Sequence, residues 1–269
     1  MMDDNGFLSQ ADSQLGDEYV ANGYIVASIE DQSSFVGIQK EIATYAASIL
    51  DLEIDVAASA FLNNIHTKLD STELNTFRLK VMERIHSDLS FNAQYFALAQ
   101  QLLYSIVGNE LVMQKRINLS IQLPDDQSSL LPIHADTWSG DSPFEAVLWV
   151  PLVDCFNSKS MFILPPSKMP EVDQFFLAEG GNLNSEDLFR QIESDLVWLN
   201  VKAGECVLFN QTLPHGNRVN NEIETRWSLN CRFKSLFSPY SDKKLGEFFE
   251  PITVKPASIV GLDYEFPGS

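Results

Sequence analysis

The stretch Arg226-Trp227-Ser228-Leu229-Asn230-Cys231-Arg232-Phe233 alternates strictly between polar and apolar residues. Successive side chains of a β-strand point to opposite faces, so this period of two predicts a strand with one polar and one apolar face. Residues 116–123, RINLSIQL, alternate in the same way. The C-terminal half of the chain is therefore expected to contain antiparallel strands that bury one face.

The remainder divides into a helical part and a part made of short strands. Residues 146–152, 160–164 and 205–210 are strand-like and bounded by Pro, Gly or Asp. Residues 1–30 are expected to form an irregular lead-in with a short strand at 24–29. Apolar residues recur at helical spacing in 32–50, 74–87 and 92–106. This order predicts an α+β fold, and the strand count favours a double-stranded β-helix (jelly-roll, cupin-like) core with an N-terminal helical layer packed on one sheet.

We predict a single domain over residues 1–269. Within it, residues 1–110 form a mainly helical N-terminal support and residues 111–237 form the double-stranded β-helix core. Residues 238–269 contain four prolines and are expected to form an irregular C-terminal tail. The helical part carries no recognisable motif.

The chain is acidic, with 37 Asp and Glu against 18 Lys and Arg and a formal charge of −19. This balance argues against nucleic acid or an anionic membrane as partner, and an anionic ligand would need cations placed locally around it.

No apolar run approaches the roughly 18 residues that span a bilayer, and the acidic start lacks signal-peptide features, so a cytoplasmic protein is expected. Cys155, Cys206 and Cys231 lack the spacing of a metal site or disulfide framework and are interpreted as reduced structural thiols. The sequence predicts no oligomeric state.

A His-x-Asp pair, His134-Ala135-Asp136, stands in the strand-rich part of the chain. Its first and third residues lie on one side of an extended segment, so both side chains can reach one ion. His215, just past the strand-like residues 205–210, can supply a third ligand. Two imidazoles and one carboxylate on one face of Fe(II) leave positions open for a cosubstrate and O₂, which is the facial triad of non-heme iron oxygenases.

The same three residues are also compatible with a different metal or with no metal at all. A His-x-Asp pair occurs often by chance. Two His and a carboxylate also serve catalytic zinc, although the helical His-Glu-x-x-His signal of zinc peptidases is absent. Mn(II) in a cupin-like isomerase is a further alternative. The chain has four histidines, and His66 and His86 are interpreted as ordinary helix-face residues.

Arg226 lies eleven residues after His215 and shares a strand face with Ser228. A guanidinium offers two parallel donors to a carboxylate, and a neighbouring hydroxyl adds a third. Asn118 and Gln122, on the polar face of residues 116–123, are further candidates for the same binding site. Any half-exposed strand also has a polar face, so residues 116–123 fit an ordinary surface strand equally well.

His-x-Asp, a later His and an Arg eleven residues beyond it resemble the 2-oxoglutarate/Fe(II)-dependent oxygenases, in particular their phytanoyl-CoA dioxygenase-like branch. Residues 159–168, KSMFILPPSK, resemble that branch's strand and turn ending in Pro-Gly-Ser-His, with Pro166 in place of the Gly and Lys168 in place of the His. Residues 132–152 are similar to a narrower group found sporadically in bacterial carbohydrate-biosynthesis clusters. The resemblance covers roughly residues 110–235.

The resemblance implies that His134, Asp136 and His215 hold Fe(II). It implies that Arg226 pairs with the distal carboxylate of 2-oxoglutarate, with Ser228 assisting. The implied enzyme is a dioxygenase that uses O₂ to oxidise, most simply by hydroxylation, a small polar metabolite such as a sugar or sugar-linked intermediate, with succinate and CO₂ as coproducts. Asp136 argues against a halogenase, which needs that position vacant for halide.

Four residues near these motifs are candidates for the substrate pocket: Trp138, Trp149, Met161 and Asn217. Trp149 and Met161 fit a role as core residues at least as well. A cupin-like metal-dependent sugar isomerase or epimerase and a non-catalytic metal-binding module are the alternative functions. Arg226 discriminates against the isomerase, which has no need of a 2-oxoglutarate anchor.

Overall fold

The computed structural model describes residues 6–178 and 184–267, and its strands form two antiparallel sheets. The larger sheet has the order β1-β7-β4-β9-β2-β10, with β3 also paired to β9. Its strands are β1 (Tyr24–Ser28), β2 (Leu111–Gln114), β3 (Asn118–Gln122), β4 (Ala146–Pro151), β7 (Glu205–Asn210), β9 (Arg226–Ser235) and β10 (Phe249–Pro251). The smaller sheet has the order β6-β5-β8, formed by β6 (Val197–Trp198), β5 (Phe162–Ile163) and β8 (His215–Gly216).

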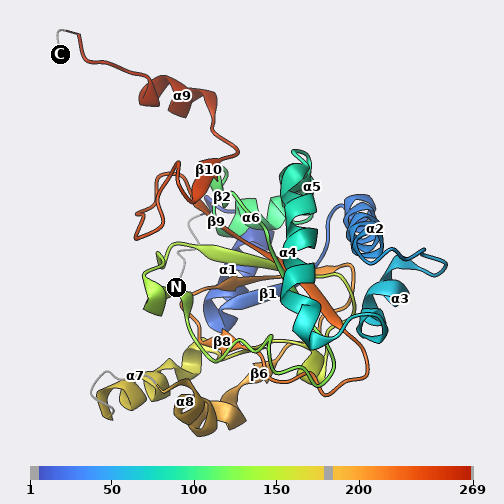
Figure 1. Ribbon diagram of the computed structural model, residues 1–269. Helices are drawn as coiled ribbons and strands as arrows, with labels where there is room; N and C mark the ends of the chain where they lie inside the picture. Colours follow the sequence, from blue (N-terminus) through green and yellow to red (C-terminus); the bar gives the residue numbers. More distant parts are fainter. Residues whose placement is uncertain (1–5, 179–183, 268–269) are drawn as a thin grey trace.

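Helices surround these sheets (Figure 1). They are α1 (Gln10–Asn22), α2 (Gln32–Ile49), α3 (Ala58–Asn63), α4 (Ser71–Ser87), α5 (Phe91–Ala97), α6 (Gln100–Ile106), α7 (Met169–Ala178), α8 (Ser185–Ile192) and α9 (Pro256–Leu262). Short 3₁₀ turns lie at η1 (Ile65–Thr67), η2 (Asp136–Ser139), η3 (Asn157–Lys159), η4 (Pro166–Lys168) and η5 (Glu193–Asp195). Figure 1 shows α7 and α8 beside the smaller sheet, far from α9. The architecture is α+β with antiparallel sheets, as the sequence predicts.

The alternation of β9 decides which of its side chains reach the core. Trp227, Leu229, Cys231 and Phe233 are fully buried in one apolar cluster together with Ile42 of α2 and Val81 of α4. The intervening residues Arg226, Ser228, Asn230 and Arg232 line a cavity on the other face. The period of two therefore separates the packing face of this strand from its chemical face, because successive strand side chains point in opposite directions.

The predicted helix over residues 92–106 is wrong, because the structure has two helices there, α5 and α6. The backbone leaves the helical region at Ala99, with φ −146° and ψ 33°. Glu30 explains the break. Its carboxylate accepts hydrogen bonds of 3.0 Å from the backbone N–H groups of Gln101 and Leu102 at the start of α6. A cap supplied from 71 residues away leaves no local signal in the periodicity.

The lead-in and the tail also differ from expectation. The N-terminal segment contains α1, which Ser9 caps at its start and Gly23, with φ 76°, ends in the left-handed conformation. No residue of α1 is fully buried, and a helix without a buried apolar face gives only a weak period from which to predict it. The tail is not irregular throughout, because it contains α9 and the strand β10, which pairs with β2.

Candidate metal and cosubstrate site

The smaller sheet and its neighbouring loop bring the two histidines of the triad together. His134 donates its backbone N–H to the His215 carbonyl at 3.0 Å, and His215 donates to the His134 carbonyl at 2.8 Å. Asp136 begins η2 just beyond, where its backbone N–H donates to the Gln211 carbonyl at 3.1 Å. One ligand atom from each of His134, Asp136 and His215 lies within 4.8 Å of the others. The three side chains can therefore hold one metal ion.

Each imidazole is oriented by a backbone carbonyl. Nδ1 of His134 lies 2.9 Å from the Pro132 carbonyl, and Nδ1 of His215 lies 2.8 Å from the Leu213 carbonyl. A carbonyl oxygen only accepts, so Nδ1 carries a proton in both rings and Nε2 is the nitrogen left to face a metal. This is the hydrogen-bond pattern that prepares a histidine to bind a metal through Nε2.

The charge state of the triad also suits a metal. Burial, followed by the charge of nearby His134, lowers the pKa of His215 to about 4, so the imidazole is neutral at pH 7. Burial alone would raise the pKa of Asp136. The guanidinium of Arg232, with its Nη2 2.9 Å from Asp136 Oδ1, and the charges of His215 and His134 together outweigh that effect, so the pKa lies below its usual value. The site thus presents a neutral imidazole at His215 and a carboxylate at Asp136.

Arg232 belongs to a charged cluster that supports Asp136. Its Nη2 lies 3.2 Å from Asp141 Oδ2, and its Nε donates to Gln211 Oε1 at 3.1 Å. Lys243, from the C-terminal segment, donates to Asp141 Oδ2 at 2.7 Å. Sequence reasoning did not assign Arg232, Gln211 or Lys243 to the site. The available signal was that Arg232 shares the strand face of Arg226.

A cavity of about 570 Å³ lies between the two sheets. Strands β3, β4, β7 and β9 of the larger sheet contribute to its wall, as does β8 of the smaller sheet. His134, Asp136 and His215 line it together with Arg226 and Ser228. We call this space the central cavity. The metal ligands and the predicted carboxylate anchor therefore share one chamber.

Arg226 is buried at 3% exposure, and burial lowers its pKa. Its Nη1 donates to the Ser160 carbonyl at 3.1 Å and its Nη2 to Ser120 Oγ at 2.9 Å. Arg226 Nε and the hydroxyls of Ser228 and Ser160 are buried without a hydrogen-bond partner in the described residues. A buried charged donor without an acceptor is costly. An anionic oxygen in the cavity would satisfy such donors, so the residues present fit a carboxylate ligand.

The other predicted residues divide into two groups. Asn118, Trp149, Met161 and Asn217 line the central cavity. Asn118 donates to Asn230 Oδ1 at 3.0 Å across the β3–β9 pair.

Gln122 and Trp138 do not line the central cavity. Gln122 lies opposite Arg226 in the strand register but is fully buried, and its Nε2 donates to the Arg218 carbonyl at 2.5 Å. Trp138 packs edge-on against Phe176 of α7 with ring centroids 5.1 Å apart. The structure therefore does not bring these two side chains together with the triad.

No family model matches the chain, and a search of curated proteins gives no match. Among solved structures, EctD from S. alaskensis with 2-oxoglutarate and 5-hydroxyectoine is 16% identical, with 89% of this chain and 80% of that chain covered and a TM-score of 0.54. HygX from Streptomyces hygroscopicus, with nickel and 2-oxoglutarate bound, is 13% identical over 88% and 90% of the two chains, with a TM-score of 0.51. The apo form of the non-heme monooxygenase ThoJ is 16% identical over 84% and 79%, with a TM-score of 0.50.

The chain has the fold of these enzymes. At such low identity the likeness concerns the fold alone, so the site must be argued from its own residues. In the described residues, no helix is both long and apolar enough to cross a membrane.

Proposed function

We propose that this protein is a non-heme Fe(II) and 2-oxoglutarate-dependent dioxygenase of the phytanoyl-CoA dioxygenase-like branch, built on a double-stranded β-helix with a helical layer on one sheet. It oxidises, most simply by hydroxylation, a small polar metabolite and releases succinate and CO₂. The sequence resemblance makes a sugar or sugar-linked intermediate the first candidate substrate. The observation that carries the proposal is the buried Arg226, which keeps an unpartnered Nε and lines the central cavity together with the His134, Asp136 and His215 triad.

His134, Asp136 and His215 would hold Fe(II) through two Nε2 atoms and a carboxylate oxygen. Arg226 would bind the distal carboxylate of 2-oxoglutarate, and the free hydroxyl of Ser228 would donate to it. Fe(II), with 2-oxoglutarate, supplies O₂ activation and the oxidising step. The chain's own contribution is to orient both ligands. Trp149 and Met161, each less than 10% exposed, provide apolar wall that excludes water from the cavity.

The alternative functions fit Arg226 less well. A metal-dependent sugar isomerase or epimerase that works without 2-oxoglutarate has no use for a buried guanidinium with an unsatisfied donor. A non-catalytic metal-binding module would have no use for it either, because burying a charge without a partner costs stability. Iron is favoured over zinc for the same reason. A guanidinium that binds a keto-acid cosubstrate is of use to an iron oxygenase, whereas a zinc enzyme has no such cosubstrate.

The test is an anaerobic titration of the purified protein with Fe(II) and 2-oxoglutarate. We expect the weak visible charge-transfer band of an Fe(II)–keto acid chelate, and its loss in His134→Ala and Arg226→Ala. With O₂ admitted, succinate release is then screened over sugars and nucleotide sugars. A wild-type protein that gives no band, or a band indifferent to both substitutions, overturns the proposal.

A further inference from the structure

A third arginine, Arg78, lines the central cavity from the helical side. It is half-buried on α4, at the edge strand β3. Its Nη2 donates to Asn75 Oδ1 at 2.8 Å, and its Nη1 lies 3.4 Å from the Leu119 carbonyl and 3.3 Å from Met82 Sδ. All of these acceptors are uncharged. Within the described residues, Arg78 has no carboxylate partner.

The charged side chains that line the central cavity do not balance. Arg78, Arg226 and Arg232 line the central cavity, whereas Asp136 is the one carboxylate that does so among the described residues. The charges of Fe(II) and 2-oxoglutarate cancel, and Asp136 offsets one arginine. Arg232 also contacts Asp141, but Lys243 offsets that carboxylate. The loaded cavity would keep two positive charges in a chain whose formal charge is −19.

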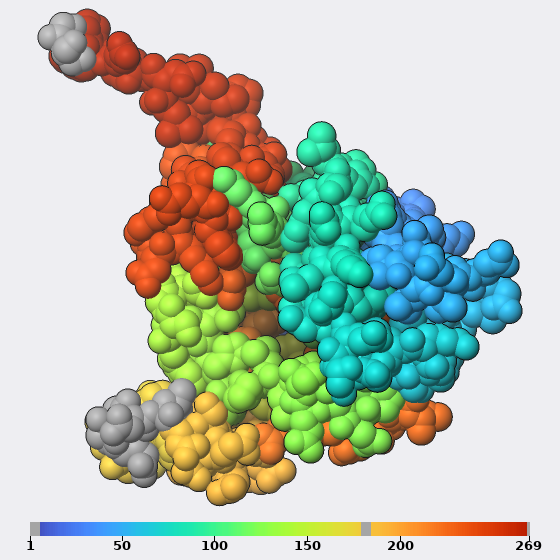
Figure 2. Space-filling view, in the orientation of Figure 1, coloured from blue at the N-terminus to red at the C-terminus, as the bar shows by residue number. Residues whose placement is uncertain are grey.

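The position of Arg78 suits a ligand that enters from outside. Leu74 and Asn75 of the same helix also line the cavity, so this face of α4 forms part of its wall. Figure 2 shows the molecule hollowed beside the teal surface of α4, between it and the green surface of the segments that follow. Arg226 is buried, whereas Arg78 stays half-exposed. Of these two arginines, Arg78 is therefore the more accessible to a molecule that enters the cavity.

We propose that Arg78 binds an anionic group, a carboxylate or a phosphate, on the substrate. This inference rests on the proposed function, because it assigns Arg226 to 2-oxoglutarate and leaves Arg78 for the substrate. The hydrogen bonds to Asn75 and Leu119 hold the guanidinium in place and leave its remaining N–H groups for a charge-assisted pair. The substrate class is thus narrowed to acidic or phosphorylated polar metabolites.

The experiment uses the full chain loaded with Fe(II) and 2-oxoglutarate, as wild type, Arg78→Gln and Arg78→Lys. Arg84→Gln is the matched control, because Arg84 lies on α4 but not in the cavity wall. The probes are matched pairs: glucose with glucose 6-phosphate, glucose with glucuronate, and methanol with inorganic phosphate. Each is titrated while the charge-transfer band and succinate release are followed.

We expect only the anionic members to perturb the band or stimulate succinate release. Arg78→Gln should weaken their apparent affinity about ten- to a hundredfold, as loss of a charge-assisted hydrogen bond does. Arg78→Lys should recover part of this loss. The affinity for 2-oxoglutarate should stay unchanged in both variants, and Arg84→Gln should behave as wild type.

Three outcomes with the band present would overturn the assignment. The first is that neutral and anionic probes perturb the band or succinate release alike. The second is that no anionic probe has any effect. The third is that Arg78→Gln weakens the affinity for 2-oxoglutarate and not that for the anionic probes. Absence of the band in the wild type would mean that the proposed function itself is wrong, so the two failures are distinguishable.

Discussion

At the scale of single residues, Arg226 and Ser228 are the proposed cosubstrate ligands on one face of β9. Both side chains are buried, and both keep a polar atom without a partner among the described residues. Buried polar groups in folded proteins are nearly always satisfied, so unpartnered donors on two residues that line a cavity are consistent with the proposed ligand. The sequence pattern predicted these two residues because strand alternation puts them on one face.

We expect Arg226→Gln to raise the KM for 2-oxoglutarate about ten- to a hundredfold, because a charge-assisted hydrogen bond is worth about 1.5–3 kcal/mol. Ser228→Ala should have a smaller effect in the same direction. The measurement is succinate release against 2-oxoglutarate concentration. Arg116→Gln, an exposed position just before β3, is the control. An unchanged KM in a folded Arg226→Gln protein would contradict the assignment.

The metal-free protein should lose stability as the pH falls from about 6.5 to about 4. Burial lowers the pKa of His215 to about 4, whereas the pKa of an unfolded histidine is about 6.5. Between these values the unfolded chain binds the extra proton, so the His215 contribution is complete above pH 6.5 and disappears toward pH 4. The loss in the free energy of unfolding is at most about 3 kcal/mol.

Urea unfolding in the presence of a chelator, at a series of pH values, measures the slope of the unfolding free energy against pH. His215→Gln should flatten it relative to wild type. Equal slopes in the two proteins would show that His215 is not the titrating group.

At the scale of elements, the C-terminal segment supports the metal loop. Ser142 donates to the Pro239 carbonyl at 2.7 Å, and Asp242 donates its backbone N–H to the Gly140 carbonyl at 3.2 Å. Lys243 then reaches Asp141, which contacts Arg232, the partner of Asp136. The tail therefore supports the orientation of Asp136, a proposed metal ligand, through the charges of Asp141 and Arg232.

We expect Lys243→Met to weaken Fe(II) binding about tenfold, the lower end of what the loss of a supporting contact to a metal ligand costs. The affinity for Fe(II) can be measured by anaerobic equilibrium dialysis. Lys244→Met is a matched control, since Lys244 is exposed and its ammonium donates to the Ser241 carbonyl, away from Asp141. Equal affinities in the two variants would contradict a role for the tail.

The elements predicted correctly are those whose environment is encoded locally. Residues 226–233 alternate because one face packs on helices and the other lines the cavity. The helix expected over 74–87 is present as α4, which Asp70 caps. The break at Ala99 and the strand β10 depend on partners distant in sequence, Glu30 and β2, so periodicity could not predict them.

The candidate site follows the same rule, because its locally encoded residues could be predicted and those brought in from distant elements could not. Spacing predicted that His134, Asp136, His215 and Arg226 come together, and all four line the central cavity; their roles stay predictions. Lys243 and Arg78 come from the tail and from α4, and only the fold brings them to the metal loop and the cavity. Trp138 was predicted from sequence proximity alone, and it packs on α7 instead.

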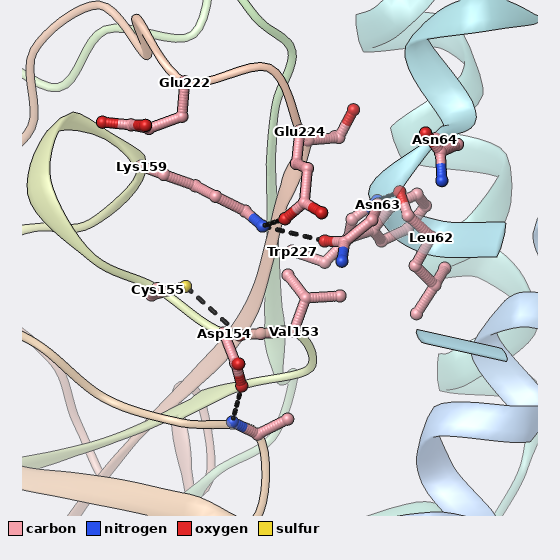
Figure 3. Close-up of polar contacts among 12 residues, drawn as sticks. Leu62, Asn63, Asn64, Val153, Asp154, Cys155, Lys159, Glu222, Glu224 and Trp227 are labelled. Atoms are coloured by element: carbon pink, nitrogen blue, oxygen red, sulfur yellow. Dashed lines mark hydrogen bonds and ion pairs between the residues drawn. The ribbon is translucent and has the colours of Figure 1, made fainter. Parts of the chain in front are cut away.

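At the scale of the whole molecule, a buried polar cluster joins the helical part to the sheet that carries Arg226 (Figure 3). Lys159 is fully buried, and its Nζ donates to Glu224 Oε2 at 2.7 Å and to Asn63 Oδ1 at 2.8 Å. Trp227 Nε1 donates to the Leu62 carbonyl at 2.9 Å, which attaches α3 to the start of β9. The cluster therefore connects packing of the helices to the position of Arg226, the proposed cosubstrate anchor.

The two partners of this ion pair should contribute unequally to stability. Glu224→Gln leaves a buried ammonium without its counter-charge and should lower the free energy of unfolding by about 3 kcal/mol. Lys159→Met leaves a carboxylate whose side chain is 36% exposed and can be hydrated, so the loss should be only about 1 kcal/mol. The double variant should resemble Lys159→Met, because the unpaired buried charge is gone.

Urea unfolding measures the stability of all three variants. Asp187→Asn, at the exposed pair with Arg190, is the control and should change stability by less than about 0.5 kcal/mol. Equal losses in the two single variants, or a larger loss for Lys159→Met, would show that burial of the ammonium is not what couples the helices to β9.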